Sequence, residues 1–144
     1  LISSQPRFLV DKGWAGIDIE YANKFVYRFS TNAKKKIKRF VNLVGQPDVS
    51  TNAVLNKHLL SDHIAKLSSQ LSMLFKNDLR EEYKNLSCDV LHVFNQKDAV
   101  LNQNIHQLLA LNPKVETITL EDAGHAGFVS HSEIYQKLIR EFIS

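Results

Sequence analysis

Two short β-rich runs in the last third of the chain constrain its fold more than any other feature of the sequence. DVLHVF (residues 89–94) is mostly apolar, which is the pattern of a strand buried on both faces. KVETITL (residues 114–120) alternates and is rich in β-branched side chains, which predicts a second strand. Between them, NQNIHQLLAL (residues 102–111) has the apolar spacing of a helix. The order strand, helix, strand predicts an α/β fold with parallel strands and a right-handed crossover.

Two strands cannot by themselves form a stable parallel sheet, because such a sheet is buried on both faces. The chain begins with LIS rather than with methionine, and this tripeptide has the pattern of a buried strand that runs into a turn. We therefore expect Leu1 to follow a missing N-terminal portion of the same protein, which holds the other strands. On this interpretation the chain contributes two parallel strands, with flanking helices, to the C-terminal part of a larger sheet.

The first half of the chain has a helical pattern. From Trp14 to about Lys84, apolar residues recur at spacings of three and four, and glycines are few. Four stripes fit separate helices: Ile19, Ala22, Val26 and Phe29; Ile37, Phe40, Val41 and Val44; Leu55, Leu59 and Leu60; and Ile64, Leu67, Leu71, Leu74 and Phe75. A last helix is predicted to start near Ser130, because SHSE matches a capping box with Ser130 as N-cap and Glu133 three residues later.

The composition limits the classes of protein to consider. The chain has 144 residues, of which 44% are hydrophobic and 23% charged, which is the balance of one ordinary globular domain. No apolar run is long enough to span a membrane. The net charge is +3, but the basic residues are not interleaved with aromatic residues as in many nucleic-acid-binding proteins. The single cysteine, Cys88, excludes an intramolecular disulfide and a cysteine-based metal site. It fits a reducing compartment, so we expect a cytoplasmic protein.

An aspartate and a histidine follow the two predicted strands. Asp98 lies four residues after Phe94, and His125 lies five residues after Leu120. Functional loops of open α/β sheets lie at the carboxyl ends of strands, so neighbouring strands would bring these two side chains to one edge. We expect them within hydrogen-bond reach, roughly 2.6–3.2 Å. An aspartate beside a histidine holds the imidazole in one tautomer and stabilises its protonated form, as the acid of a catalytic triad does for the base.

Small residues surround His125 in EDAGHAGFVSH (residues 121–131), which would leave space for a substrate ester and a nucleophile beside its ring. The order acid and then histidine, late in the chain, is that of α/β-hydrolases, whose nucleophile comes earlier. No serine of this sequence lies in a Gly-x-Ser-x-Gly elbow, so we expect the nucleophile and the oxyanion hole upstream. The alternatives are that Asp98 only forms a turn and that His125 is structural or merely exposed.

The other candidate side chains suit structural roles better. His131 falls within the predicted capping box, and His92 falls within a predicted strand. His58 and His63 are five residues apart, which is the wrong spacing for metal ligands on one helical face. Cys88 has no base beside it in the sequence and is not expected to be a nucleophile. We therefore expect neither a metal site nor a cofactor.

The segments DVLHVFNQKDAVLNQN and VETITLEDAGHAGFVSHSE resemble the C-terminal end of the α/β-hydrolase superfamily. Its members typically have a strand, Gly-x-x-Asp, a helix, a second strand and then Gly-His-x-x-x-x-x-His. Asn95 stands where the glycine before the acid is usual, and Asp89 stands where a proline is usual at the start of the strand. Neither change touches Asp98 or His125, and asparagine tolerates a left-handed backbone better than most residues.

A closer resemblance is to the pimeloyl-[acyl-carrier protein] methyl ester esterases of biotin synthesis. SSQPRF and DKGWAGI, at the start of the chain, resemble the segment after the nucleophile helix of that family. AGHAGFVSH resembles its Ala-His-Ala-Pro-Phe-Ile-Ser-His. Here Gln5 is an extra residue, Ala15 and Gly127 each replace a proline, and Gly124 precedes the histidine.

This resemblance divides the chain into three parts and implies an activity. Residues 1–13 would end a core strand and lead to the lid, residues 14–84 would form a helical lid, and residues 85–144 would form the C-terminal core segment. The implied activity is that of a serine carboxylesterase, which hydrolyses the methyl ester of pimeloyl-[acyl-carrier protein] to pimeloyl-[acyl-carrier protein] and methanol. Phe40 matches a position that lines the acyl channel, although a core phenylalanine fits the sequence equally well.

Two alternatives to this activity stay open. The first is an α/β-hydrolase of another specificity, such as a lipase-like esterase, a lactonase or a C–C hydrolase, which would share the triad and differ in the lid. The second is a non-catalytic module of the same fold that binds a partner through the basic lid. A Gly-x-Ser-x-Gly serine in the upstream sequence would favour an enzyme over the binding module.

The resemblance also implies a partner, because basic lid residues of that family bind the acidic acyl carrier protein. AKKKIKRF (residues 33–40) is the only dense basic run of the sequence, and Lys35 and Arg39 match two of the carrier-binding positions. Lys35 and Arg39 are four residues apart and so share one helix face. Two further arginine positions of the family fall near Asn52 and Asn56. The alternative is an ordinary solvated helix face.

Overall fold

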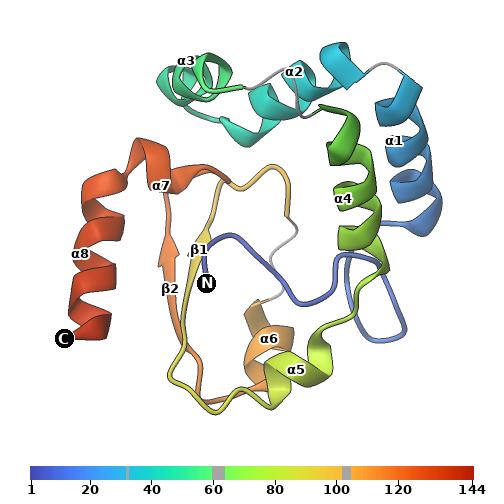
Figure 1. The fold of residues 1–144 in the computed structure, drawn as a ribbon. Coiled ribbons are helices and arrows are strands. Elements are labelled where there is room, and N and C mark those ends of the chain that lie inside the picture. The colour runs from blue at the N-terminus through green and yellow to red at the C-terminus, as the bar shows by residue number, and fades with distance from the viewer. Residues whose placement is uncertain (32, 60–63, 102–104) are drawn as a thin grey trace.

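The structure of the chain is a computed structural model that describes residues 1–31, 33–59, 64–101 and 105–144. A small parallel sheet lies between helices: α8 lies along one face, α5 and α6 lie on the other, and α2 and α3 lie beyond the carboxyl ends of the strands (Figure 1). In chain order the elements are α1 (Ile19–Thr31), α2 (Ala33–Val44), α3 (Val49–Lys57), α4 (Ile64–Lys76), α5 (Arg80–Lys84), β1 (Leu91–Asn95), α6 (Ile105–Leu111), β2 (Glu116–Leu120), α7 (Gly127–Ser130) and α8 (Ser132–Ile143).

The sheet has the parallel pairing that the sequence predicted. β1 and β2 pair in register from Leu91 opposite Glu116 to Asn95 opposite Leu120. All five residues of β1 are buried, which agrees with its apolar run, whereas no residue of β2 is fully buried. The exposed residues of β2 are Glu116 and Thr119, so its burial does not follow the strict alternation expected from the sequence.

The first residues of the chain lie along the other edge of β1. Ile2 forms a parallel bridge with Val93. The amide of Ser3 donates to the carbonyl oxygen of Val93 at 3.1 Å, and the amide of Val93 donates to the carbonyl oxygen of Leu1 at 2.9 Å. The start of the chain is therefore joined to β1 by one bridge, so β1 has a backbone partner on both sides.

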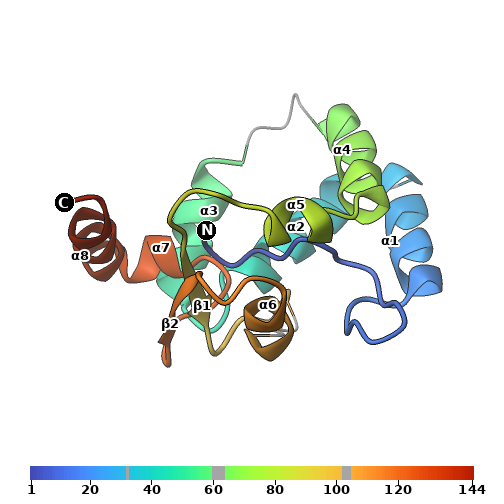
Figure 2. The ribbon, with the colours of Figure 1, turned by 90° about the horizontal axis from the view of Figure 1, so that it is seen from below.

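Helices α1 to α4 pack mainly on one another. α1 contacts α2 and α4, α2 contacts α3 and α4, and α3 reaches α7 (Figures 1 and 2). The ring centroid of Phe25 lies 6.2 Å from that of Phe29 on the same helix and 6.1 Å from that of Phe40 on α2, and the second contact joins the two helices. Three of the four apolar stripes correspond to α1, α2 and α4. Of the third stripe only Leu55 lies in α3, because the helix ends at Lys57 before Leu59, and Leu60 lies outside the described residues, as do residues 102–104 of the predicted later helix.

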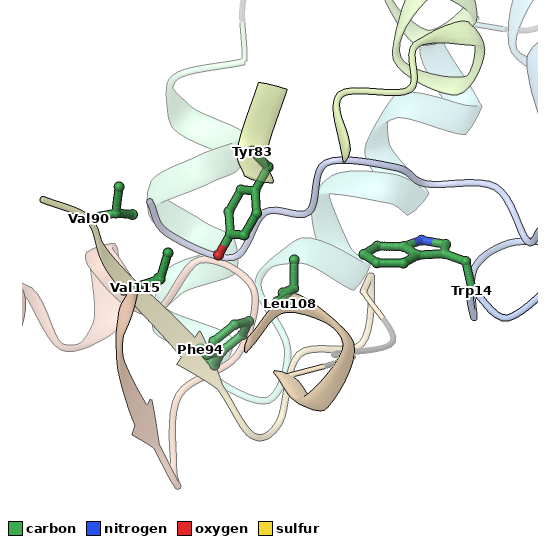
Figure 3. Close-up of a cluster of buried hydrophobic side chains, with 6 residues drawn as sticks. All are labelled: Trp14, Tyr83, Val90, Phe94, Leu108 and Val115. Carbon is green, nitrogen blue, oxygen red and sulfur yellow. The ribbon is translucent and has the colours of Figure 1, made fainter. Parts of the chain in front are cut away.

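Side chains from both halves of the chain form the core beside α5 and α6. Its buried members are Trp14, Tyr83, Val90, Phe94, Leu108 and Val115 (Figure 3). On the opposite face of the sheet, Leu91 and Val93 pack with Tyr135 of α8. Successive side chains of a strand point to opposite faces, so the apolar run of β1 supplies both clusters. Burying one such large apolar side chain contributes about 1.5–3 kcal/mol.

The predicted capping box at the start of the last helix is wrong. α8 begins at Ser132 with His131 as its N-cap and without a side-chain capping bond. Ser130 is instead the last residue of the short helix α7, and its hydroxyl oxygen lies 2.8 Å from His131 Nδ1 and 3.5 Å from the carbonyl oxygen of Gly127. An N-cap needs a non-helical backbone, which Ser130 does not have, because α7 already winds there.

Within the described ranges, no helix has both the length and the apolar character needed to cross a bilayer.

Candidate active site

The loop after β1 holds the carboxylate of Asp98 by backbone hydrogen bonds. The amide of Asp98 donates to the carbonyl oxygen of Asn95 at 3.0 Å, which closes a turn directly after the strand. Its Oδ1 accepts from the amides of Val100 at 2.8 Å and Leu101 at 2.9 Å. One oxygen is therefore occupied by the backbone, and Oδ2 is left for another donor.

The loop after β2 carries His125 and is braced by the corner between α2 and α3. The amide of Ala126 donates to the carbonyl oxygen of Val44 at 3.2 Å. A Cβ atom at Gly124 would collide with the carbonyl oxygen of Gln46, so only glycine fits there. From the sequence, the small residues around His125 are expected to leave space for the substrate and the nucleophile. The backbone of this corner fills part of that space, on the side of Gly124.

Asp98 and His125 meet between the two loops, as their positions after consecutive strands predicted. Nδ1 of His125 lies 2.8 Å from Oδ2 of Asp98. The Asp98 side chain is fully buried, and that of His125 is 23% exposed. An ionised carboxylate can only accept, so Nδ1 donates and Nε2 of a neutral imidazole keeps its lone pair. That tautomer can take a proton from a neighbouring group at Nε2.

Asp98 remains charged in spite of its burial. Burial is the largest single influence and raises the pKa of the Asp98 carboxyl, but the hydrogen bonds from His125, Leu101 and Val100 outweigh it, so the pKa lies below its ordinary value. The carboxylate is therefore ionised at neutral pH. It can orient the imidazole and stabilise its positive charge after protonation.

The predicted partner-binding and channel residues lie on α2. Lys35 and Arg39 are exposed, and Phe40 is half-buried with its ring edge-on to that of Phe25. Asn56, near one of the expected arginine positions, donates through Nδ2 to Asn42 Oδ1 at 3.2 Å and to the carbonyl oxygen of Asn52 at 2.8 Å. The amide of Asn56 thus joins α2 to α3.

His92, His58 and Cys88 belong to other parts of the fold. His92 is fully buried on β1, stacked on Phe94, and its Nε2 lies 3.0 Å from the carbonyl oxygen of Ser4. Cys88 is exposed, His58 ends α3, and His63 lies outside the described residues. Within the part of the chain that the structure describes, no three histidine, cysteine or acidic residues gather as metal ligands would.

Sequence reasoning missed two contributions to this site. The corner of residues 44–46 lies 80 positions before His125, and only the glycine at 124 hinted that another backbone approaches there. Asn95 and Tyr135 also form a buried hydrogen bond beside the Asp98 turn, and the departure at Asn95 from the usual glycine was its only signal.

No protein-family model matches the chain. Curated relatives do match it along nearly its whole length. Pimeloyl-[acyl-carrier protein] methyl ester esterase of Aliivibrio fischeri (strain ATCC 700601 / ES114) is 29% identical over 99% of the chain, and that of Yersinia enterocolitica is 28% identical over 98%. The chain spans 58% and 57% of the length of these two relatives.

A solved structure has the same fold. The esterase EaEST from Exiguobacterium antarcticum superposes with a TM-score of 0.73 at 16% identity, over 96% of this chain and 54% of that one. This likeness confirms the fold class expected from the sequence, an α/β-hydrolase sheet portion with helices. The chain is thus similar over nearly its whole length to part of the pimeloyl-[acyl-carrier protein] methyl ester esterases, which confirms the resemblance read from its sequence.

Proposed function

We propose that this chain supplies the acid and the base of a serine carboxylesterase. The observation that supports the proposal is the hydrogen bond of 2.8 Å between Asp98 and His125, at the carboxyl ends of two adjacent parallel strands. A nucleophilic serine and an oxyanion hole from a segment upstream of this sequence would complete the site, since no Gly-x-Ser-x-Gly elbow occurs in it.

The proposed reaction follows from the tautomer that Asp98 imposes. Nε2 of His125 takes the serine proton as the hydroxyl oxygen attacks the ester carbonyl, and Asp98 stabilises the imidazolium that forms. His125 then gives that proton to the departing alkoxide, so the alcohol leaves and an acyl-enzyme remains. Water, deprotonated in the same way by His125, attacks the acyl-enzyme, and the acid is released as the serine regains its proton.

We further propose the methyl ester of pimeloyl-[acyl-carrier protein] as substrate, with methanol as the leaving alcohol. The names of the relatives, at 26–29% identity, support this substrate. The exposed Lys35 and Arg39 on α2 fit an acidic carrier protein, and residues 14–84 would serve as the lid above the site, with Phe40 toward the acyl channel.

One observation favours a second candidate, a carboxylesterase that acts on free esters. Asn52 and Asn56 lie near two positions where the family resemblance implies carrier-binding arginines, and here the side chain of Asn56 is hydrogen-bonded between α2 and α3. A weaker electrostatic attraction to the carrier would suit a small free substrate. The two candidates share the Asp98–His125 chemistry and differ in their preference for carrier-bound substrate.

The test is ester hydrolysis by the whole protein and by its His125→Ala variant. We expect the wild type to release methanol from pimeloyl-[acyl-carrier protein] methyl ester, followed by mass spectrometry of the carrier. The variant should lose about 10⁴- to 10⁶-fold in kcat while its circular dichroism spectrum is unchanged, because only binding and oxyanion stabilisation remain. His106→Ala, an exposed histidine on α6, serves as the control. Hydrolysis of a p-nitrophenyl ester at the wild-type rate by His125→Ala would refute the assignment.

A further inference from the structure

Asn95 is a fully buried polar side chain at the carboxyl end of β1. Its Oδ1 accepts from the hydroxyl of Tyr135 at 2.6 Å, and its Nδ2 donates to Oγ of Ser3 at 2.8 Å. The three residues belong to three segments: Ser3 to the strand-like start of the chain, Asn95 to β1 and Tyr135 to α8. One amide therefore joins segments that lie side by side at the sheet edge bearing the candidate site.

This network touches both loops of the Asp98–His125 pair. The carbonyl oxygen of Asn95 accepts from the amide of Asp98, so the same residue begins the turn that holds the acid. On the other side, a Cβ atom at Gly127 would lie 2.9 Å from Asn95 Nδ2 and 3.0 Å from the Tyr135 hydroxyl. Gly127 is the second residue after His125, so the network packs against the start of α7, which directly follows the base.

The Tyr135 hydroxyl keeps its proton and donates it to Asn95 in a hydrogen bond. Burial is the main cause that raises the pKa of Tyr135, and the negative charge of Asp98 raises it further. The phenol therefore stays protonated and its proton is directed to Asn95 Oδ1. A buried polar network whose members are all satisfied restricts the segments that it joins.

We propose that Asn95 and Tyr135 are positioning residues that keep the Asp98 loop and the His125 loop in register. The inference rests on the proposed function of the Asp98–His125 pair. Neither residue touches the reacting atoms; each acts through the geometry of the pair. A small displacement of such a pair lowers the rate of the chemical step more than it lowers substrate binding.

The test compares two tyrosine-to-phenylalanine variants of the whole protein. Tyr135→Phe removes one hydroxyl oxygen and leaves the ring in place. Tyr83→Phe is the matched control, because Tyr83 is also buried and its hydroxyl lies 3.4 Å from His92 Nδ1, on the other face of β1. We expect Tyr135→Phe to lower kcat about 10-fold with little change in KM. Tyr83→Phe should leave both constants unchanged.

A second measurement separates this inference from the proposed function. The proton on His125 Nδ1 gives a strongly deshielded NMR signal when Asp98 Oδ2 accepts it, whether or not the protein hydrolyses an ester. We expect that signal to weaken or move in Tyr135→Phe and in Asn95→Gly, and to persist in Tyr83→Phe. If the wild type hydrolyses no ester, the proposed function fails, while this signal still decides the positioning role.

A double variant adds a further criterion. Tyr135 acts through its hydrogen bond to Asn95, which Asn95→Gly already removes together with the bond to Ser3. The double variant Asn95→Gly with Tyr135→Phe should therefore lose hardly more kcat, and no more of the NMR signal, than the worse single variant. Wild-type kcat together with a wild-type Nδ1 proton signal in folded Tyr135→Phe would overturn the proposal. If Asn95→Gly does not fold, Tyr135→Phe alone decides.

Discussion

Asp98 and His92 are two buried ionisable side chains, and burial leaves them in opposite charge states. Asp98 keeps its charge, because His125 and two backbone amides donate to its carboxylate. His92 loses its charge, because burial, the main cause, lowers its pKa to about 4. The neighbours of each residue therefore stabilise one protonation state. Asp98 stays ionised because His125 donates a hydrogen bond to it, whereas His92 stays neutral.

The neutral state of His92 predicts acid sensitivity. Its pKa in the fold, about 4, lies below the value of 6.5 for an unperturbed histidine, so the unfolded chain binds the proton more readily. Stability is therefore complete above about pH 6.5 and falls as the pH drops toward 4, by up to about 1.4 kcal/mol for each pH unit. Urea denaturation of the whole protein at pH 7 and pH 5 measures this loss. His92→Gln should reduce the difference between the two pH values; an equal difference in both proteins would contradict the prediction.

At the scale of single elements, α2 exposes a basic face to solvent, and the corner that follows it contacts the His125 loop. The helix buries Ile37 and exposes Lys35 and Arg39, so its basic face is directed to solvent. The corner that ends α2 contacts the His125 loop through Val44 and Gln46. A partner that binds the basic face would therefore contact an element that also braces the candidate base.

Charge reversal on α2 tests the carrier partner. The double variant Lys35→Glu with Arg39→Glu should lower kcat/KM for carrier-bound methyl ester about 10-fold at low salt, because exposed charges act mainly on the association rate. Hydrolysis of a small free methyl ester should be unchanged. Lys137→Glu with Arg140→Glu is the matched control, since it makes the same change of charge on α8.

The ratio of the two specificity constants decides between the two candidate functions. If α2 guides the carrier protein, charge reversal on α2 should lower the ratio of kcat/KM for carrier-bound ester to kcat/KM for free ester. High salt should narrow the difference from the wild type, and charge reversal on α8 should leave the ratio unchanged. If the ratio is the same in all three proteins, the acyl carrier protein is not guided by this face, and a general esterase is the better description.

At the scale of the whole molecule, an ionic cluster joins the two ends of the helical region. Arg7 and Asp11 precede α1, whereas Asp78 and Arg80 follow α4. Asp78 Oδ2 lies 2.9 Å from Arg7 and 2.7 Å from Arg80, and Arg80 also lies 2.9 Å from Asp11 and 5.5 Å from the ring centre of Trp14. The hydrogen bonds from Arg80 are the main cause that lowers the pKa of Asp78 to about 2. The segments that enter and leave α1–α4 are thus tied at one point.

Removing the charge of Asp78 should loosen this tie by a small amount. The cluster is partly exposed and screened by solvent, so Asp78→Asn should lower the free energy of unfolding by about 1 kcal/mol or less. The pKa of Asp78 is depressed, so its contribution is present above its ordinary value of 3.8 and is lost as the pH falls toward 2.

Urea denaturation at low and high salt measures the Asp78→Asn effect. Glu20→Gln, which removes an isolated exposed pair with Lys24, is the control and should change nothing measurable. An Asp78→Asn effect that is independent of salt would exclude an electrostatic origin.

The local patterns of the sequence predicted β1, β2 and most of the helices, whereas α5 and α7 were not predicted. The apolar run of β1, the alternation of β2 and the stripes of α1–α4 are local repeats, and hydrophobic burial acts on each repeat in the same way wherever it lies. The parallel pairing of the two strands followed from the order strand, helix, strand. The meeting of Asp98 with His125 followed because both side chains come directly after neighbouring parallel strands.

Only the tertiary structure decided the contacts that brace the site. Asn95 finds its partners 40 and 92 positions away in the sequence, in Tyr135 and Ser3, and Gly124 meets the backbone of Gln46. The start of α8 could not be predicted from the local sequence either. The motif at Ser130 matches a capping box, but Ser130 is the last residue of α7 and α8 starts at Ser132. A hydrogen bond or a close contact depends on atomic positions within a few tenths of an ångström. Local patterns do not carry that information, because it arises only when distant segments pack together.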